Sequence, residues 1–377
     1  MADLFFYGTL RYAELLELVL GRPKDSLDIS EASLSGHGVF AVVDQIFPAI
    51  EEREGHVAAG ILARGLTPKD VAALNFYEGG FDYDLKKVVV QLGDGAKAAA
   101  EVYFPEPGLW QTGVTWDLNQ WISDWGELTL RAAEEVMAYQ GRRTAAEMAQ
   151  CFPSIRKRAA AWVAAQKRAG DPERDLDKDV VVHAHKHAHI NFFAMEEIDL
   201  QFRRYDGSMS PVVNRCAAMV GRASVVLPYD PVRDEVLLIE QFRAATYIAG
   251  EQRPWMWEAV AGMVDPGETP EQAAHREAME EAGITLTTLE PVANAYPSSG
   301  ASGEFLHIFV GTGDFSKREA GGGLDSEAED IRCEVISFEE LMAGIDSQEY
   351  QDMPLVTSAL CLTRHRDRLR KDANNTF

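Results

Sequence analysis

Residues 262–284 read GMVDPGETPEQAAHREAMEEAGI and predict a helix with well-defined ends. Thr269 suits the N-cap, Pro270 suits the first helical position, and Gln272 completes a capping box with the threonine. Gly283 occupies the position just after the helix, where a left-handed backbone is common. Local signals alone therefore delimit this helix at both ends.

The predicted helix carries a cluster of carboxylates. Glu280 and Glu281 follow Glu277 by three and four residues, so the three side chains share one face. Like charges this close destabilise a helix unless cations compensate them, and Mg²⁺ is commonly held by carboxylates together with substrate phosphate oxygens. Arg276 can orient one carboxylate through a bidentate contact. The alternative interpretation is a solvated acidic face, the commoner fate of a glutamate-rich run.

The spacing of the whole stretch favours the first interpretation. Glycine, five residues, glutamate, seven residues, Arg-Glu, two residues, Glu-Glu, one residue, glycine and an aliphatic residue follow at fixed intervals. This pattern resembles the Nudix box, and Ala278 is a mild departure because a larger aliphatic residue is common there. The flanks at 239–243, 254–263 and 324–331 resemble the ADP-ribose pyrophosphatase branch of the Nudix hydrolases, and the resemblance covers about residues 208–369.

This resemblance implies a C-terminal α/β/α Nudix sandwich that forms a homodimer through the Nudix domain. It implies hydrolysis of a small-molecule nucleoside diphosphate, ADP-ribose, to AMP and ribose 5-phosphate, with Mg²⁺ as cofactor and Mn²⁺ as an alternative. Two other functions stay open. The substrate could be another nucleoside diphosphate derivative, such as an ADP-sugar, NADH or a dinucleoside polyphosphate, or the protein could be a sensor that binds ADP-ribose without cleaving it.

Site residues also follow from the resemblance. The implied metal ligands are Glu277, Glu281, Glu329 and the backbone carbonyl of Ala261, with Glu280 and Glu268 in support. Glu327 corresponds to the glutamate that activates the attacking water, and Glu280 and Arg276 also belong to the implied catalytic group. A base on a loop that follows a run of three glycines can close on the metal cluster once substrate is bound.

The implied substrate contacts match the family less closely. Arg243 corresponds to an arginine on the pyrophosphate side, and Ser298 and Glu304 resemble a loop that contacts ribose. Arg215 is a weaker candidate for the adenosine end. The chain reads PSSGASGE at 297–304 where the family tends to read SPGGTSE, and one extra residue separates Arg243 from the box. These departures leave the exact substrate open but not the type of reaction.

The first hundred residues predict a different, α+β domain with short strands, among them 38–43 and 56–62. FYGTLR at 6–11 resembles the opening loop of gamma-glutamylcyclotransferase-like domains, where a glycine lets backbone N–H groups approach a carboxylate. Glu78 aligns with that family's acidic residue, which is a general base toward the substrate α-amino group. The implied substrate-binding residues are Tyr7, Gly8, Thr9 and Leu10. Asp84 stands where relatives often carry arginine, so a pocket without turnover is the alternative.

Three segments are predicted along the chain. They are a gamma-glutamylcyclotransferase-like domain at 1–115, a helical connector at 116–175 and the Nudix domain at 176–377. Within the connector, Pro153 is expected to start a new helix rather than interrupt one. The pairing of these domains resembles that of two-domain bacterial tellurite-resistance proteins.

Composition limits the class of partner. The 377 residues include 36 Lys+Arg and 60 Asp+Glu, a net charge of −24, which would repel a bare phosphate backbone and argues against a nucleic-acid partner. No apolar run approaches the roughly 20 residues needed to cross a bilayer, and the first residues lack the pattern of a signal peptide. The four cysteines form no CxxC pair. We therefore expect a cytoplasmic protein with reduced thiols and no membrane partner.

Overall fold

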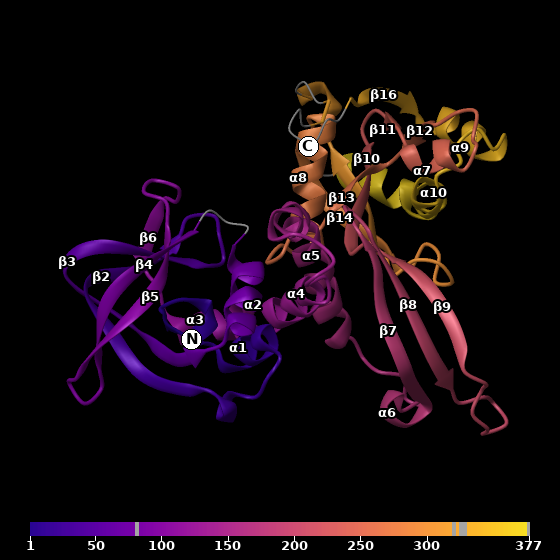
Figure 1. The fold of residues 1–377 in the computed structure, drawn as a ribbon. Coiled ribbons are helices and arrows are strands. Elements are labelled where there is room, and N and C mark those ends of the chain that lie inside the picture. The colour runs from indigo at the N-terminus through magenta and orange to yellow at the C-terminus, as the bar shows by residue number, and fades with distance from the viewer. Residues whose placement is uncertain (80–82, 319–321, 324–329, 375–377) are drawn as a thin grey trace. The chain divides into compact units, whose positions relative to one another are not determined.

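The computed structural model describes residues 1–79, 83–318, 322–323 and 330–374 (Figure 1). The chain divides into two compact units. The first comprises Met1–Asp175 with Lys186–Phe192, and the second comprises Leu176–His185 with Phe193–Phe377. The predicted class, an α+β domain, connecting helices and an α/β/α Nudix sandwich, is confirmed, whereas the exact boundaries at 115 and 175 stay predictions.

A six-stranded sheet forms the centre of the first unit. Its strands are β1 (Ala2–Phe6), β2 (Asp28–Val42), β3 (Pro48–Leu66), β4 (Tyr83–Leu92), β5 (Lys97–Pro105) and β6 (Thr112–Thr115). They lie in the order β3-β1-β5-β4-β2-β6, and β2 also pairs with β3, so the sheet closes on itself. Side chains alternate along a strand, so Phe5 of β1 is buried in one core cluster and Leu4 and Phe6 in another, with the helices.

Helices follow and flank this sheet. They are α1 (Ala13–Leu20), α2 (Pro68–Glu78), α3 (Leu118–Trp121), α4 (Glu127–Met137) and α5 (Ala145–Gln166), with short turns η1 (Thr9–Arg11) and η2 (Lys24–Ser26) and a π-helical turn η3 (Ile122–Gly126). The prediction that Pro153 starts a helix is wrong, because Pro153 lies inside α5. A capping box of Thr144 and Glu147 starts α5 earlier, and Met148 and Ile155, on either side of the proline, are buried in one cluster with α4. This packing outweighs the cost of about 3 kcal/mol that a proline inside a helix incurs through a lost hydrogen bond and a steric clash.

The second unit contains two sheets. Strands β7 (Val180–Ile190), β8 (Ala194–Phe202) and β9 (Val213–Met219) form the smaller one. The larger consists of β10 (Arg222–Asp230), β11 (Glu235–Phe242), β12 (Trp255–Glu258), β13 (Val260–Met263), β14 (Leu286–Ala295), β15 (Phe305–Gly313) and β16 (Arg332–Ser337). Its order is β12-β11-β10-β15-β14, β13 pairs with β10, and β16 pairs with β11. The pairing of β10 with β15 is parallel.

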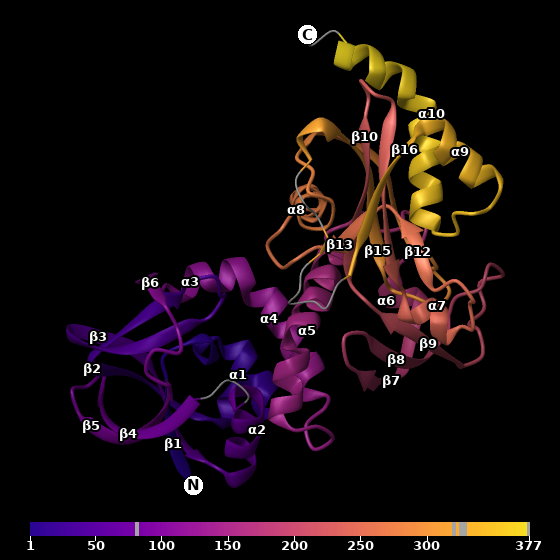
Figure 2. The same ribbon diagram turned by 90° about the horizontal axis from the view of Figure 1, so that it is seen from above.

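Helices cover both faces of the larger sheet (Figure 2). The helices of this unit are α6 (Leu176–Asp179), α7 (Ala244–Ile248), α8 (Pro270–Ala282), α9 (Phe338–Asp346) and α10 (Met353–Asn374), with a short turn η4 (Phe315–Lys317). Val226 of β10 packs with α8, whereas its neighbours Val225 and Leu227 pack with α9 and α10. This alternation produces the three-layer sandwich. Within the described ranges, no helix has the length and apolar character needed to span a membrane.

Candidate active sites

Helix α8 forms with the predicted ends. The Thr269 hydroxyl accepts a hydrogen bond from the Gln272 backbone N–H, and the Gln272 side chain accepts one from the Thr269 N–H. Gly283 ends the helix with a left-handed φ of 64°. The alanines of α8 are buried against the sheet, and Glu281 is buried with them, whereas Glu277 and Glu280 are partly exposed.

Arg276 holds the carboxylates of this region in place. Its guanidinium makes a bidentate contact with Glu268, with Nε–Oε1 and Nη2–Oε2 distances of 3.0 Å. Nη1 donates to Glu277 Oε1 at 2.5 Å and to Glu280 Oε2 at 3.1 Å, and Nη2 also donates to the Met263 carbonyl at 3.0 Å. The bonds to Glu268 and the nearby carboxylates raise the pKa of Arg276 despite partial burial. The arginine therefore stays charged and orients several acids at once.

Predicted metal ligands of α8 lie next to a predicted ligand of β13. Glu281 is 2% exposed, and its Oε2 accepts a hydrogen bond from the Ala261 N–H at 3.1 Å. A Cβ on Gly262 would lie 1.8 Å from Glu277 Oε1, so only glycine lets that carboxylate approach the strand. The structure thus brings together Ala261, Glu277 and Glu281, whose oxygen atoms are donors that suit a hard divalent cation.

The structure does not test the remaining part of the predicted metal shell. Glu327 and Glu329 fall outside the described residues. Among the side chains that the structure describes, no group of three or more His, Cys, Asp or Glu is arranged to hold a metal ion. The predicted shell needs the carbonyl of Ala261 and the carboxylate of Glu329 in addition to the two glutamates of α8.

Arg243 lies in a second charged group of the same unit. Its Nε and Nη2 donate to the Glu258 carboxylate at 2.9 Å and 2.6 Å, respectively. Burial raises the pKa of Glu304, and the positive charge of Arg243 reduces this increase. Burial also raises the pKa of Asp352 to about 6, and the charge of Glu258 adds to this effect. The charges of Glu281 and Asp352 act in turn on Arg243, so this group adjoins the acids of α8.

Sequence reasoning missed two members of the Arg243 group, Glu258 and Asp352. Glu258 stands in the flank that resembles the family, but it pairs with Ile239 on β11 and not with Arg243, so only the folded side chains show the contact. Asp352 lies far along the chain at the start of α10, where it accepts from the Leu355 N–H at 2.8 Å. Of the other predicted contacts, Arg215 is exposed on β9 and Ser298 lies in the exposed turn before β15.

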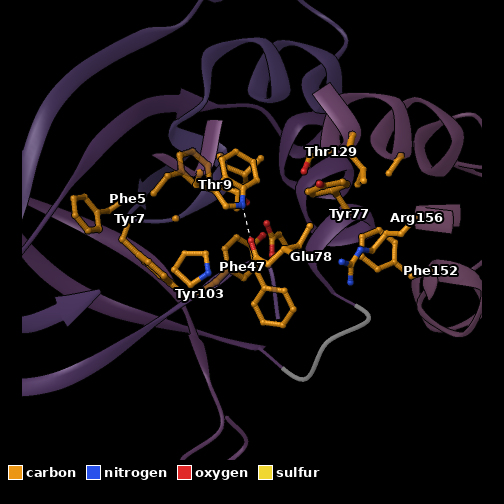
Figure 3. Close-up of a pocket in the computed structure, with 18 residues that line it drawn as sticks. Phe5, Tyr7, Thr9, Phe47, Tyr77, Glu78, Tyr103, Thr129, Phe152 and Arg156 are labelled. Carbon is orange, nitrogen blue, oxygen red and sulfur yellow. Dashed lines mark hydrogen bonds between the residues drawn. The ribbon is translucent and has the colours of Figure 1, made fainter. Parts of the chain in front are cut away.

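The first unit contains a cavity of about 110 Å³ (Figure 3). Its lining includes the four predicted loop residues Tyr7, Gly8, Thr9 and Leu10 together with Glu78 at the end of α2. Aromatic side chains of Phe5, Phe47 and Tyr103 form much of the remaining wall. Residues that are some 70 positions apart in the sequence therefore meet in one pocket, as the resemblance implies.

Glu78 has the electrostatics of a proton-transfer group. Burial raises its pKa from 4.5 to about 7, because an ionised carboxylate is poorly solvated among apolar walls. Two polar side chains of the same lining bond to groups other than Glu78: the Tyr103 hydroxyl donates to Asn75 Oδ1 at 2.5 Å, and Trp121 Nε1 donates to the Ile46 carbonyl, also at 2.5 Å. A carboxyl that titrates near neutral pH can both accept and return a proton.

Comparisons with known proteins match each of the two units to a family. Residues 219–354 match the family model of the NUDIX domain, and residues 4–122 match that described as gamma-glutamyl cyclotransferase, AIG2-like. The chain is 37% identical over 194 residues to the ADP-ribose pyrophosphatase of Escherichia coli strain K12, covering 52% of this chain and 92% of that protein. It is 34% identical over 177 residues to the ADP-ribose pyrophosphatase of Haemophilus influenzae, with 46% and 82% covered.

A relative with another described substrate also matches. The GDP-mannose pyrophosphatase of Cronobacter sakazakii is 33% identical over 171 residues, which cover 44% of this chain and 85% of that protein. A solved structure described as an ADP compounds hydrolase aligns with a TM-score of 0.42 and 18% identity, over 51% of this chain and 97% of that one. The substrates named for the ADP-ribose and GDP-mannose pyrophosphatases share a nucleoside diphosphate but differ in the base and the sugar.

Proposed function

The chain belongs to the Nudix family of hydrolases, and we propose that its second unit cleaves the pyrophosphate bond of ADP-ribose to give AMP and ribose 5-phosphate. The observation that carries this proposal is that Glu277 and Glu281 lie beside Ala261 and Gly262 of β13, with Glu277 held by Arg276. The two relatives named ADP-ribose pyrophosphatases support the choice of substrate. The GDP-mannose pyrophosphatase makes a GDP-sugar the first alternative.

We propose that the site uses Mg²⁺, held by Glu277, Glu281, Glu329 and the carbonyl of Ala261. The ion, when bound, would neutralise the diphosphate and lower the pKa of the attacking water. Arg276 orients the carboxylates of Glu268 and Glu277 through hydrogen bonds. Glu327 is the proposed base for the water.

Arg243 is the proposed contact for the diphosphate. Glu258 binds its Nε and Nη2, which fixes the guanidinium while the side chain stays 40% exposed. Nη1 can then donate to a phosphate oxygen without breaking that pair. We also propose that two copies of the chain associate through the Nudix unit, which light scattering after size exclusion would test.

A substrate panel tests the reaction. Purified full-length protein is incubated with ADP-ribose, GDP-mannose, NADH and a dinucleoside polyphosphate, each with Mg²⁺ or Mn²⁺, and nucleoside monophosphate release is measured. We expect the highest kcat/KM with ADP-ribose. Glu281→Gln should lower kcat at least about 100-fold, on the scale of losing one catalytic electrostatic group. Glu271→Gln, on the exposed side of the same helix, is the matched control and should keep full activity.

Two results would contradict this proposal. A higher kcat/KM for GDP-mannose than for ADP-ribose would show that the proposed substrate is wrong but that the proposed type of reaction is right. Equal, low hydrolysis by wild type and Glu281→Gln, together with tight binding of ADP-ribose, would identify a sensor rather than an enzyme.

We propose a second activity for the first unit, the cyclisation of a γ-glutamyl compound to 5-oxoproline. Two observations support this activity. The Gly8 loop and Glu78 line the same cavity, and residues 4–122 match the gamma-glutamyl cyclotransferase family model. The substrate's α-amino nitrogen would attack the γ-carbonyl carbon, and the bond from that carbon to the leaving amine would break. Glu78 would take the proton from the attacking amine and return it to the leaving amine. Release of 5-oxoproline by wild type but not by Glu78→Gln tests the proposal.

A further inference from the structure

Helices α4 and α5 supply one wall of the cavity in the first unit. Their lining residues are Leu128, Thr129, Ala132, Phe152 and Arg156. All of them lie beyond residue 122, where the match to the cyclotransferase family model ends. Figure 3 shows Thr129, Phe152 and Arg156 along one side of the cavity and Phe5 and Tyr7 along the other. This chain therefore completes its pocket with residues that the family match does not contain.

Thr129 presents an unsatisfied polar atom to this wall. The side chain is only 8% exposed, and among the described residues its hydroxyl has no hydrogen-bond partner. Threonine in a helix commonly bonds to the carbonyl four residues earlier, but here it does not. Leaving a buried polar group without a hydrogen bond is unfavourable. A polar group of a ligand in the cavity would remove this penalty.

The charges of the lining are divided between two elements. Glu78 on α2 and Arg156 on α5 are the charged members of the described lining, and apolar and aromatic side chains make up most of the rest. An arginine in such surroundings favours a planar anion such as a carboxylate, which it can bind through two parallel hydrogen bonds. Glu78 suits the amine of the ligand, and the Gly8 loop suits its α-carboxylate, so Arg156 serves a second anionic group.

We propose that Arg156 and Thr129 form a subsite for the leaving group, which selects γ-glutamyl amino acids over γ-glutamyl amines that lack a carboxylate. This inference rests on the proposed cyclisation. The leaving amine of a γ-glutamyl amino acid carries a carboxylate that can accept hydrogen bonds from the Arg156 guanidinium and the Thr129 hydroxyl. The two residues lie on helices α5 and α4, which pack together in one core cluster.

A matched pair of substrates tests the subsite in the full-length protein. γ-Glutamyl-alanine and γ-glutamyl-ethylamide differ only in the carboxylate of the leaving group. We expect kcat/KM to be at least about 10-fold higher for γ-glutamyl-alanine, in line with one charge-assisted contact. Arg156→Gln should remove this preference by lowering kcat/KM for γ-glutamyl-alanine alone, and Arg156→Lys should restore part of it. Unchanged turnover of the ethylamide shows that the variant is folded.

Controls separate the subsite from general effects. Thr129→Val, which keeps the shape of the side chain, should lower kcat/KM for γ-glutamyl-alanine only. Lys167→Gln removes a positive charge beyond the end of α5, outside the cavity lining, and should change neither substrate. If wild type turns over the two compounds with equal kcat/KM, the proposed subsite is wrong, whereas the proposed cyclisation is supported.

Calorimetric binding distinguishes failure of the subsite from failure of the proposed activity. If neither compound yields 5-oxoproline, preferential binding of γ-glutamyl-alanine that is lost in Arg156→Gln would support the subsite and reject cyclisation. Equal binding of both compounds, or binding of neither, would overturn the subsite.

Discussion

Replacing Glu78 by glutamine should make the stability of the first unit less dependent on pH. The wild-type carboxyl has a pKa of about 7 in the folded protein because it is buried, against 4.5 for a solvated glutamate. Between these pH values the folded state binds more protons than the unfolded chain, so stability falls as the pH rises. The penalty is nearly absent below pH 4.5 and complete above about pH 7. Glutamine cannot ionise and therefore avoids it.

The size of this effect follows from the pKa of Glu78. One pKa unit corresponds to about 1.4 kcal/mol, so the full penalty is about 3 kcal/mol, of which about 2 kcal/mol develops between pH 5.5 and pH 8.5. Both pH values lie above the sequence pI of about 4.8, which keeps the protein charged and soluble. For a domain of this size, 2 kcal/mol corresponds to a change in Tm of about 4–8 °C.

Differential scanning calorimetry of the full-length protein measures this effect. The Tm of Glu78→Gln relative to wild type should rise by about 4–8 °C on going from pH 5.5 to pH 8.5. Glu106→Gln, in an exposed loop of the same unit, is the matched control, and its difference from wild type should stay constant. A constant difference for Glu78→Gln as well would mean that Glu78 ionises like a solvated acid, which would remove the argument that it transfers protons near neutral pH.

Three further outcomes are expected. Gly262→Ala should abolish ADP-ribose hydrolysis in a folded protein, because the new Cβ would displace the Glu277 carboxylate; activity within twofold of wild type, with normal circular dichroism, would contradict the proposed site. Arg158→Met should destabilise the protein by about 3–5 kcal/mol in urea unfolding, because the buried Glu135 loses its ion pair with Arg158, and Arg158→Met with Glu135→Met should recover most of that loss; no recovery would assign the effect to packing instead. EDTA should abolish AMP release but leave release of 5-oxoproline unchanged, and equal loss of both would place a metal in the first unit as well.

The parts of the fold that sequence could predict have local signals. Thr269 and Gln272 determine the start of α8, and Gly283 determines its end. All three residues occupy the expected positions. The run 38–43 overlaps the end of β2, and the run 56–62 lies inside β3. The full extents, Asp28–Val42 and Pro48–Leu66, were not predictable, because polar and exposed stretches such as 51–55 interrupt the apolar pattern and continue the strands through backbone pairing.

The parts that sequence could not predict depend on contacts between distant segments. Pro153 is tolerated inside α5 only because both flanks pack against α4. Asp352 meets the charges around Arg243 only through the placement of α10. Thr129 and Arg156 carry no motif, and their position in the cavity follows from how two helices cover the sheet. A sequence pattern within one segment does not predict which distant segment will contact it.

The two units place their glutamates in different surroundings. In the Nudix unit, Arg276 donates hydrogen bonds to Glu268, Glu277 and Glu280, which orients the oxygen atoms proposed to face a cation. In the first unit, burial raises the pKa of Glu78 to about 7, which favours exchange of a proton. The surroundings of each glutamate, rather than its residue type, therefore determine which chemistry it can perform.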